Sequence, residues 1–330
     1  MRVAAASTGN VPPLAAPKRY TVWNRLASST LRQPLILSCL VFIGLITLIA
    51  IVVPLLPLQD PDAQSFVFRL KPPSGVHWLG TDRLGRDIFS RVFWSARISL
   101  FVGVGVVVLS GLAGTVLGMI GGYFSGWFSS LIMRLIDILL AFPPLILALV
   151  LVTVLGNNVF TVILAISVGA LPRFTRIAQG SILSIRERGY VEAARALGAT
   201  NRSIMLRHVL LNAVDPLIVI STFLIPLAII LEATLSFIGV GVTEPTPTWG
   251  NMISSGQVVL VEAPWLTLFP ALAIGLTVLA FNLFGDAVRD ALDPSVVDLD
   301  ASRAEAPRPA RTGGSQGAEL NLAGEAAEPA

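Results

Sequence analysis

The stretch RERGYVEAARALGATNRSIMLRHVLLN, residues 186–212, separates two long apolar segments of this chain. From Arg173 to Arg207 the sequence holds seven arginines and two glutamates. Charged side chains are costly in lipid, so this segment is predicted to lie in water between two membrane spans. There it would either lie on the membrane surface or dock onto a soluble partner, and its residues favour the partner.

The same stretch predicts two short helices joined by a turn. Residues 190–197 fit about two helical turns, and Gly198 ends them, because glycine commonly follows a helix C-terminus. Thr200 or Asn201 can cap a second helix that runs on to residue 211. The expected result is a helix–turn–helix elbow that projects from a membrane domain.

The composition indicates an integral membrane protein. Of the 330 residues, 54% are apolar and 13% are charged, whereas soluble domains average about 25% charged residues. The single cysteine, Cys39, and two distant histidines, His77 and His208, are a weak basis for a metal site. Neither lysine, Lys18 or Lys71, follows a glycine, so a P-loop is absent from the sequence. We therefore expect no metal site, no cofactor and no catalytic residue in this chain.

Uncharged runs long enough to cross a bilayer, which takes about 20 residues, predict six spans. The long run 138–172 is divided at Gly156-Asn157-Asn158, which has the composition of a turn. The expected spans are 34–57, 98–123, 132–155, 159–177, 209–231 and 265–287. The first span is longer than a signal-peptide core and no small-residue cleavage site follows it, so we expect it to act as an anchor.

The distribution of arginine and lysine predicts the orientation. Residues 1–33 carry five basic residues and no acidic one, so the N-terminus is expected in the cytoplasm. Six spans then place the 178–208 loop and the C-terminus inside, and the acidic segment 239–264 outside. Residues 58–96 conflict with this rule, because they are expected outside yet hold five basic residues, partly balanced by four aspartates. The net charge of +3 is attributed to these loops and not to nucleic-acid binding.

Within the charged segment, Glu192-Ala193-Ala194 with Gly198 six residues after the glutamate resembles the EAA loop of bacterial ABC importer permeases. The resemblance implies a coupling helix that sits in a cleft of an ATP-hydrolysing subunit. Small alanines would allow close approach, and the glutamate would make a charge-assisted contact. The coupling residues would be Tyr190, Glu192, Ala193, Ala194, Arg195, Gly198 and Ala199. The alternative is a solvated basic loop whose charge only sets the membrane orientation.

The segment HWLGTDRLGRD, residues 77–87, is similar to one found before the core in the dipeptide/oligopeptide/nickel branch of these permeases. Thr81 or Asp82 can cap a helix that starts near Leu84, and this helix would lie on the outer membrane surface. The charged residues of the segment either face the substrate or have a structural role, in which they cap the helix and form ion pairs around the turn. The structural role is favoured.

The sequence MRLID followed by AFPP, residues 133–144, also resembles that branch. Arg134 and Asp137 are three residues apart and share a helix face. An ion pair at membrane depth should point into the helix bundle. Pro143 and Pro144 should kink the helix, either as a hinge for alternating access or as a fixed bend tied by the ion pair.

Further segments extend the resemblance over about residues 25–294. They are LEATLSFIGVG at 231–241, PTWG at 247–250, FNLFGD at 281–286 and RDALDP at 289–294. Two positions depart from the family pattern. Leu211 stands where proline is usual, which puts in doubt a bend at the start of the fifth span, and Gly189 stands where an acidic residue is usual.

The resemblance implies an all-α, six-helix permease of the type I ABC importer fold in the bacterial inner membrane. Its implied partners are a second permease, two subunits that bind ATP and Mg²⁺, an external binding protein and the lipid bilayer. The expected cargo is a di- or oligopeptide, with chelated nickel, glutathione and oligosaccharide left open and the residues of the substrate pathway unassigned. The expected parts are a disordered cytoplasmic tail at 1–24, an anchor helix and external loop at 25–95, a five-helix core at 96–294 with its coupling loop at 178–208, and a disordered cytoplasmic tail at 295–330.

Two other classes of protein compete with this interpretation. A secondary transporter driven by protons or sodium could use Asp137, Asp215 and Glu232, which lie at or near membrane depth. However, Arg134 stands beside the first of these acids, and six helices without an internal repeat are few for that class. A membrane scaffold without transport activity would leave the elbow and the kinked helix unexplained.

Overall fold

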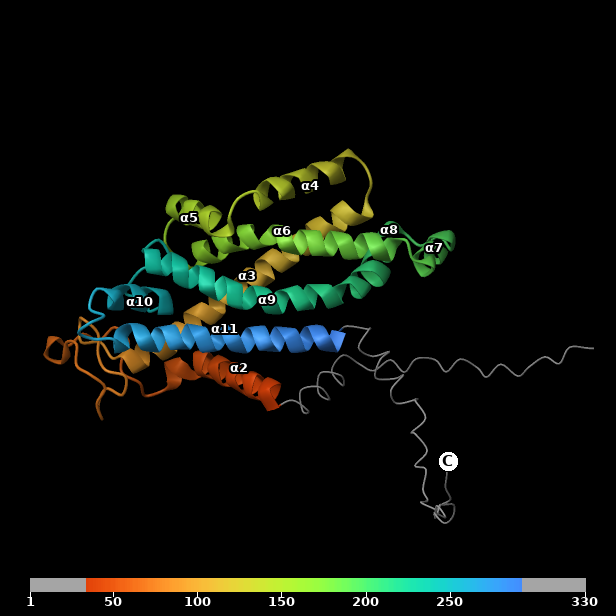
Figure 1. The fold of residues 1–330 in the computed structure, drawn as a ribbon. Helices are drawn as coiled ribbons and strands as arrows, with labels where there is room; N and C mark the ends of the chain where they lie inside the picture. Colours follow the sequence, from red (N-terminus) through yellow and green to blue (C-terminus); the bar gives the residue numbers. More distant parts are fainter. Residues whose placement is uncertain (1–33, 293–330) are drawn as a thin grey trace, which may run out of the picture. The chain divides into compact units, whose positions relative to one another are not determined.

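The computed structural model describes residues 34–292, which form one helical body (Figure 1). The tails predicted to be disordered, 1–24 and 295–330, lie outside the described residues. Within 34–292 every regular element is helical, and the only β-type pairing is an isolated bridge between Thr81 and Asp87. The predicted all-α class is therefore confirmed.

Five helices are long and apolar enough to cross a membrane, and a bent pair gives a sixth span if it is counted as one. The long helices are α2 (Pro34–Val52, extended by the 3₁₀ turn Val53–Leu55), α3 (Ile88–Tyr123), α6 (Val159–Arg186), α9 (Leu210–Ile238) and α11 (Trp265–Leu292). The bent pair is α4 (Trp127–Leu140) and α5 (Pro144–Leu155). The shorter elements are the 3₁₀ turn Phe66–Phe68, α7 (Gly189–Ala196), α8 (Asn201–Ser203), the π-helix η3 (Ile204–Val209) and α10 (Trp249–Gln257).

The predicted kink at the proline pair is a complete break. Helices α4 and α5 meet at 92°, with Pro143 at the N-cap of α5 and Pro144 as its first residue. Proline has no backbone N–H to donate and its ring clashes with the preceding turn, so two in succession end one helix and begin another. The third span is therefore not the single helix 132–155 that the uncharged run indicated.

The start of α3 also differs from the prediction. The helix begins at Ile88 and not near Leu84, because Asp87 is the N-cap and its Oδ2 accepts from the Ser90 N–H at 2.8 Å. Asp82 lies in the preceding turn, where its Oδ1 accepts a hydrogen bond from the Leu84 N–H at 2.8 Å. Gly85 then has a φ of +76°, which a helix does not allow.

Helices α3 and α6 pack closely along a row of glycines, Gly114, Gly118 and Gly122, which are spaced four residues apart on one face of α3. A Cβ added at Gly118 would lie 2.5 Å from the Ala178 Cβ, and one at Gly114 would lie 2.5 Å from the Phe174 Cβ. Small residues at this spacing let two membrane helices approach closely. The row therefore positions α6, which leads directly into the charged segment.

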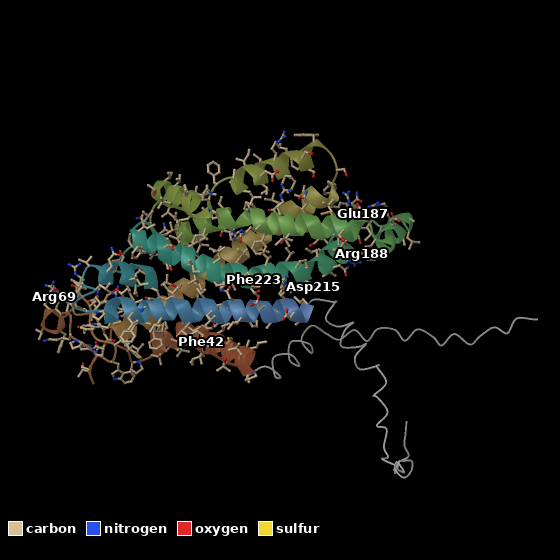
Figure 2. All side chains as sticks on the ribbon, in the orientation of Figure 1. Phe42, Arg69, Glu187, Arg188, Asp215 and Phe223 are labelled. Carbon is tan, nitrogen blue, oxygen red and sulfur yellow. The ribbon has the colours of Figure 1, made fainter. Side chains whose placement is uncertain are left out.

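The charged loops of this helical body gather at its two ends. Figure 2 shows Arg69 in the loop that precedes α3, at one end of the long helices, and Glu187 and Arg188 at the other end, beside α7. Helix α2 packs against α3 and α11, while α9 packs against α3, α6 and α11. Helix α7 at the other end contacts α6 and the π-helix η3.

Candidate coupling site

The charged segment forms the predicted elbow. Helix α7 ends at Ala196, and Gly198 follows with a φ of +81°, the left-handed conformation that commonly ends a helix. A Cβ at Gly198 would meet no atom within 4 Å, so the backbone conformation and not the available space favours glycine there. Thr200 caps the next helix, and its hydroxyl accepts from the Ser203 N–H at 3.3 Å. Both predicted helices and the turn between them are confirmed.

One apolar side chain attaches α7 to the rest of the elbow. Val191 is fully buried and is the only residue of α7 that is. It belongs to a cluster with residues of α3, α6, η3 and α9: Met119, Tyr123, Ala178, Ile182, Ile185, Ile204, Val209 and Ala213. Burying a valine stabilises its site by roughly 1.5–3 kcal/mol. The elbow is therefore packed onto the helix ends and does not hang as a free loop.

Two hydrogen bonds tie the elbow to the end of α3. The Tyr123 hydroxyl donates to Asn201 Oδ1 of α8 at 2.8 Å. Arg186 Nη1, at the last residue of α6, donates to the Gly122 carbonyl oxygen at 3.0 Å. These bonds join α8 and the last residue of α6 to the end of α3.

The predicted coupling residues divide between two faces of the elbow. Tyr190, Glu192, Ala193 and Arg195 are exposed, and so is Gly198 at the turn. They form the outward face of α7, whose charges and small side chains are available to a partner. We call this set, together with Leu197, the docking face.

The other predicted residues point inward. Ala194 and Ala199 are partly buried and pack against the cluster around Val191. Ala194 follows Val191 by three residues and therefore shares its helix face, so it is less accessible to a partner than Ala193.

Leu197 is a feature that the sequence analysis did not single out. Its side chain is 89% exposed at the tip of the elbow, directly before the turn glycine. A large apolar side chain held in water is unfavourable unless a partner covers it. The sequence signal that could have found it is an apolar residue inside an otherwise polar loop.

The link between the elbow and α9 is a π-helix rather than a bend. The π turn η3 covers Ile204–Val209, and the chain is helical without interruption from Asn201 to Ile238. Leu211, which stands in place of the usual proline, lies just after this turn and is exposed. Single π turns inside α-helices occur frequently at functional sites.

The predicted ion pair between Arg134 and Asp137 is wrong. Asp137 pairs instead with Arg176 of α6, which passes beside α4. Arg134, Asp137 and Arg176 are also exposed in this chain and do not point into its interior. The reason is that α4 turns its apolar residues Met133 and Ile136 inward, which leaves the charged ones on the outer face.

We expect Arg176→Ala and Asp137→Ala to lower stability by a similar small amount. Both side chains are about half exposed, and exposed ion pairs contribute about 0.2–1 kcal/mol. A double-mutant cycle on thermal unfolding in detergent would measure the coupling, with Arg134→Ala as the matched control. A coupling between Asp137 and Arg134 larger than that with Arg176 would contradict the observed pairing.

At the opposite end, buried ion pairs hold the HWLGTDRLGRD segment. Arg86 Nε donates to Asp82 Oδ2 at 2.6 Å, and its Nη2 lies 3.3 Å from Glu244 Oε1, in the loop before α10. Burial lowers the pKa of Arg86, but Asp82 and Glu244 outweigh it and raise that pKa above the ordinary value. The guanidinium therefore stays charged at any working pH.

Two more pairs complete this cluster. Arg91, almost fully buried, donates from Nη1 to the Pro61 carbonyl oxygen at 2.9 Å and lies 3.4 Å from Asp62 Oδ1. His77 Nδ1 lies 3.0 Å from Asp87 Oδ1. These contacts favour the structural role for the aspartates, and they explain why basic residues are tolerated in segment 58–96, because carboxylates neutralise Arg86 and Arg91.

Asp82→Ala is expected to destabilise this loop by about 3 kcal/mol, because the buried Arg86 guanidinium would keep only the partly exposed Glu244 as its ionic partner. The matched control is Arg83→Ala, an exposed neighbour, which should change stability by less than about 0.5 kcal/mol. Limited proteolysis of the loop and thermal unfolding would measure both effects. If Asp82→Ala and Arg83→Ala were equally resistant to proteolysis, the Asp82–Arg86 ion pair would not be what holds the loop in place.

The three acids that a secondary transporter could use are separated in this fold. Glu232 is fully buried and accepts from Ser236 Oγ at 2.8 Å and from Ser99 Oγ at 3.2 Å. Asp137 pairs with Arg176, and Asp215 lies exposed on the half of α9 nearer the elbow (Figure 2). Within residues 34–292 no hydrogen bond joins any two of these acids. This arrangement gives little support to a proton relay.

Comparisons with known proteins agree with this geometry. The family described as "Binding-protein-dependent transport system inner membrane component" matches residues 114–298. The glutathione transport system permease protein GsiD of Pectobacterium atrosepticum is 39% identical over 292 residues, covering 88% of this chain and 97% of that protein. The probable D,D-dipeptide transport system permease protein DdpC of Escherichia coli is 40% identical over 280 residues, covering 84% and 94%.

Among solved structures, the MetNI methionine ABC transporter in inward-facing conformations is similar with a TM-score of 0.46 and 19% sequence identity. That similarity covers 59% of this chain and 94% of the solved chain. The family match and the two permease relatives span most of the residues that form the long helices and the elbow. This chain is a multi-pass membrane protein and belongs to the binding-protein-dependent inner-membrane permeases of ABC importers.

Proposed function

We propose that this chain is one of two permease subunits of an ATP-driven importer of short peptides, and that α7 docks onto a separate ATP-hydrolysing subunit. The observation that supports docking best is the docking face itself, which offers Glu192, Arg195 and the exposed Leu197 on a helix anchored from behind by Val191. An aliphatic anchor ringed by charges is a common arrangement in a protein interface.

The proposed assembly contains a second permease, two subunits that bind ATP and Mg²⁺, and an external binding protein. With the elbow in the cytoplasm, the N- and C-termini also lie there, and the cluster around Arg86 faces the binding protein's side. This orientation agrees with the arginine bias of residues 1–33 and of the elbow.

Coupling would work as a rigid-body movement. Closure of the ATP-binding subunits would shift α7, and the buried Val191 with the Tyr123–Asn201 and Arg186–Gly122 hydrogen bonds would carry that shift to three long helices.

The π turn η3 is the place where the elbow could rotate against α9, because its wider ring departs from α-helical geometry. The 92° break between α4 and α5 would act either as a hinge or as a fixed bend.

The cargo is proposed from the relatives and not from a pocket. Glutathione and a D,D-dipeptide, named for the two relatives, are both short peptides with free carboxylates. A short peptide is therefore the cargo class we propose for this chain. Neither of these two names points to chelated nickel or an oligosaccharide, so both remain weaker alternatives.

The test is uptake into vesicles that contain the whole complex with its binding protein. A labelled dipeptide, glutathione, a longer peptide and chelated nickel would each be offered with and without ATP. We expect ATP-dependent entry of at least one of the short peptides. ATP-dependent entry of nickel alone would contradict the peptide class, and uptake that follows a proton gradient and ignores ATP would contradict the importer function.

A further inference from the structure

Two hollows beside the first part of α3, one formed with the loop after α2 and one with α2 itself, share one residue, Arg97. The first, which we call the headgroup pocket, has a volume of about 570 Å³. Its polar lining comes from the loop after α2, from α3 and from the loop before α10: Gln59, Asp60, Asp62, Trp94, Arg97 and Thr246. The second, the acyl groove, has a volume of about 390 Å³ and starts at the same arginine. Its other lining residues are Thr47, Ala50, Ile51, Leu100, Phe101 and Val104.

The headgroup pocket lies where two membrane spans leave the hydrocarbon. The uncharged run that contains α2 ends immediately before Asp60, and the one that contains most of α3 begins immediately after Arg97. Trp94, one turn from Arg97, belongs to a residue type enriched at the membrane–water interface. The pocket is therefore at the depth of lipid headgroups, at the end of the helices opposite to the elbow.

The charges in this pocket are complementary to a zwitterion. Within residues 34–292 no carboxylate lies within ion-pair distance of the Arg97 guanidinium, whose Cζ is 6.0 Å from the centre of the Trp94 ring. Asp60 is exposed and accepts only the backbone N–H of Asp62 there, while Asp62 already pairs with Arg91. One cation and one carboxylate thus remain available to a ligand.

The acyl groove continues from Arg97 toward the middle of the membrane. From Arg97 to Val104 the helix rises roughly 10 Å, which is a large part of the ~15 Å that one leaflet contributes to the hydrocarbon core. The groove is lined on one side by a stripe of α3 and on the other by α2, where Ile51 is 69% exposed. A polar pocket that continues as an apolar groove into the bilayer matches a phospholipid, whose polar headgroup continues into apolar acyl chains.

We propose that the headgroup pocket and acyl groove together bind one membrane phospholipid with a primary-amine headgroup, the phosphatidylethanolamine class. The phosphate lies on Arg97, the ammonium lies by Asp60, and the upper part of one acyl chain fills the groove. A lipid held there adds to the packing of α2 on α3, where Ile46 and Ala50 already share a buried cluster with Leu100.

Native mass spectrometry of the delipidated full chain in a mild detergent tests this proposal. Phosphatidylethanolamine, phosphatidylcholine and phosphatidylglycerol with identical acyl chains are added at equal concentration. We expect one retained phosphatidylethanolamine per chain and weaker retention of the other two. Arg97→Gln should lower its retention at least about tenfold, the loss expected for a charge-assisted hydrogen bond. Arg83→Gln, an exposed arginine outside both hollows, should retain it like the wild type.

Two further variants separate the headgroup pocket from the acyl groove. Asp60→Asn should reduce the preference for phosphatidylethanolamine over phosphatidylcholine. Ile51→Trp, which fills the groove, should lower retention of all three lipids, whereas Leu48→Trp on the same helix but outside the groove should not. Equal retention of the three lipids by wild type and variants would overturn the proposal. Displacement of the lipid by a dipeptide, with no effect of Ile51→Trp, would overturn it too and assign the pocket to the cargo.

Discussion

Leu197→Asp is expected to reduce ATP-dependent uptake at least about tenfold while the protein remains folded and inserted. Burying the Leu197 side chain in a partner would contribute roughly 1.5–3 kcal/mol, and an aspartate in the same place would have to be buried without a partner. Because Leu197 contacts little in this chain, its replacement should leave the thermal unfolding temperature almost unchanged. Uptake into vesicles and binding of the ATP-hydrolysing subunit would both be measured.

Two charge-reversal variants, one on the docking face and one just before α7, test the same surface. Glu192→Lys lies on the docking face and should uncouple ATP hydrolysis from uptake, whereas Glu187→Lys, exposed just before α7, should have a smaller effect. If both reversals left uptake coupled, α7 would not be the transmission point.

Cross-linking tests the orientation of α7 directly. The only native cysteine, Cys39, is replaced by serine, and single cysteines are placed at Ala193 and at Ala194. The outward Ala193→Cys should cross-link to the ATP-hydrolysing subunit in at least one nucleotide state, and the inward Ala194→Cys much less. The reverse order would contradict the docking face as the structure defines it.

Gly118→Leu is expected to prevent the protein from folding into a stable membrane form. A Cβ at this position would already lie 2.5 Å from the Ala178 Cβ and 2.7 Å from the Thr175 carbonyl oxygen, so α3 and α6 would have to separate. Overpacking by a few methylenes costs typically 1–3 kcal/mol in a core that can adjust, and two helix backbones adjust less readily than side chains. Gly118→Ala should show a milder form of the same defect.

The control is Gly44→Leu on α2, where an added Cβ meets no atom within 4 Å. Yield of monodisperse protein and unfolding temperature in detergent are the readouts. If Gly118→Leu behaved like Gly44→Leu, the close contact between α3 and α6 would not be essential to the fold.

Local patterns in the sequence located the membrane spans and the elbow, although not the start of α3 or the short helix α10. Uncharged runs located the spans, because a charge inside lipid is costly whatever surrounds it. The elbow at 190–198 followed from Gly198 and from a capping residue, since helix ends depend on neighbouring backbone groups. The proline pair predicted a disturbance in the third span, but its size, 92°, depends on what the two half-helices pack against.

The family itself followed from several short motifs in the right order, and the sequence relatives confirm it. No motif, however, distinguishes one cargo from another. In the proposed assembly the pathway is shared with a second permease, so the residues that select cargo would not gather in the sequence of one chain.

What only the tertiary structure decided is which residues meet across helices. The sequence spacing predicted an ion pair between Asp137 and Arg134. In the structure α4 packs on α6, and Asp137 pairs with Arg176 instead. The sequence analysis also did not predict that Ala194 packs on the side of the buried Val191, that Gly118 contacts Ala178, or that Arg97 lines two hollows. These four contacts share one physical reason. Spacing along the sequence determines which residues of one helix lie on the same face, whereas a contact between two helices depends on how each helix is rotated about its own axis.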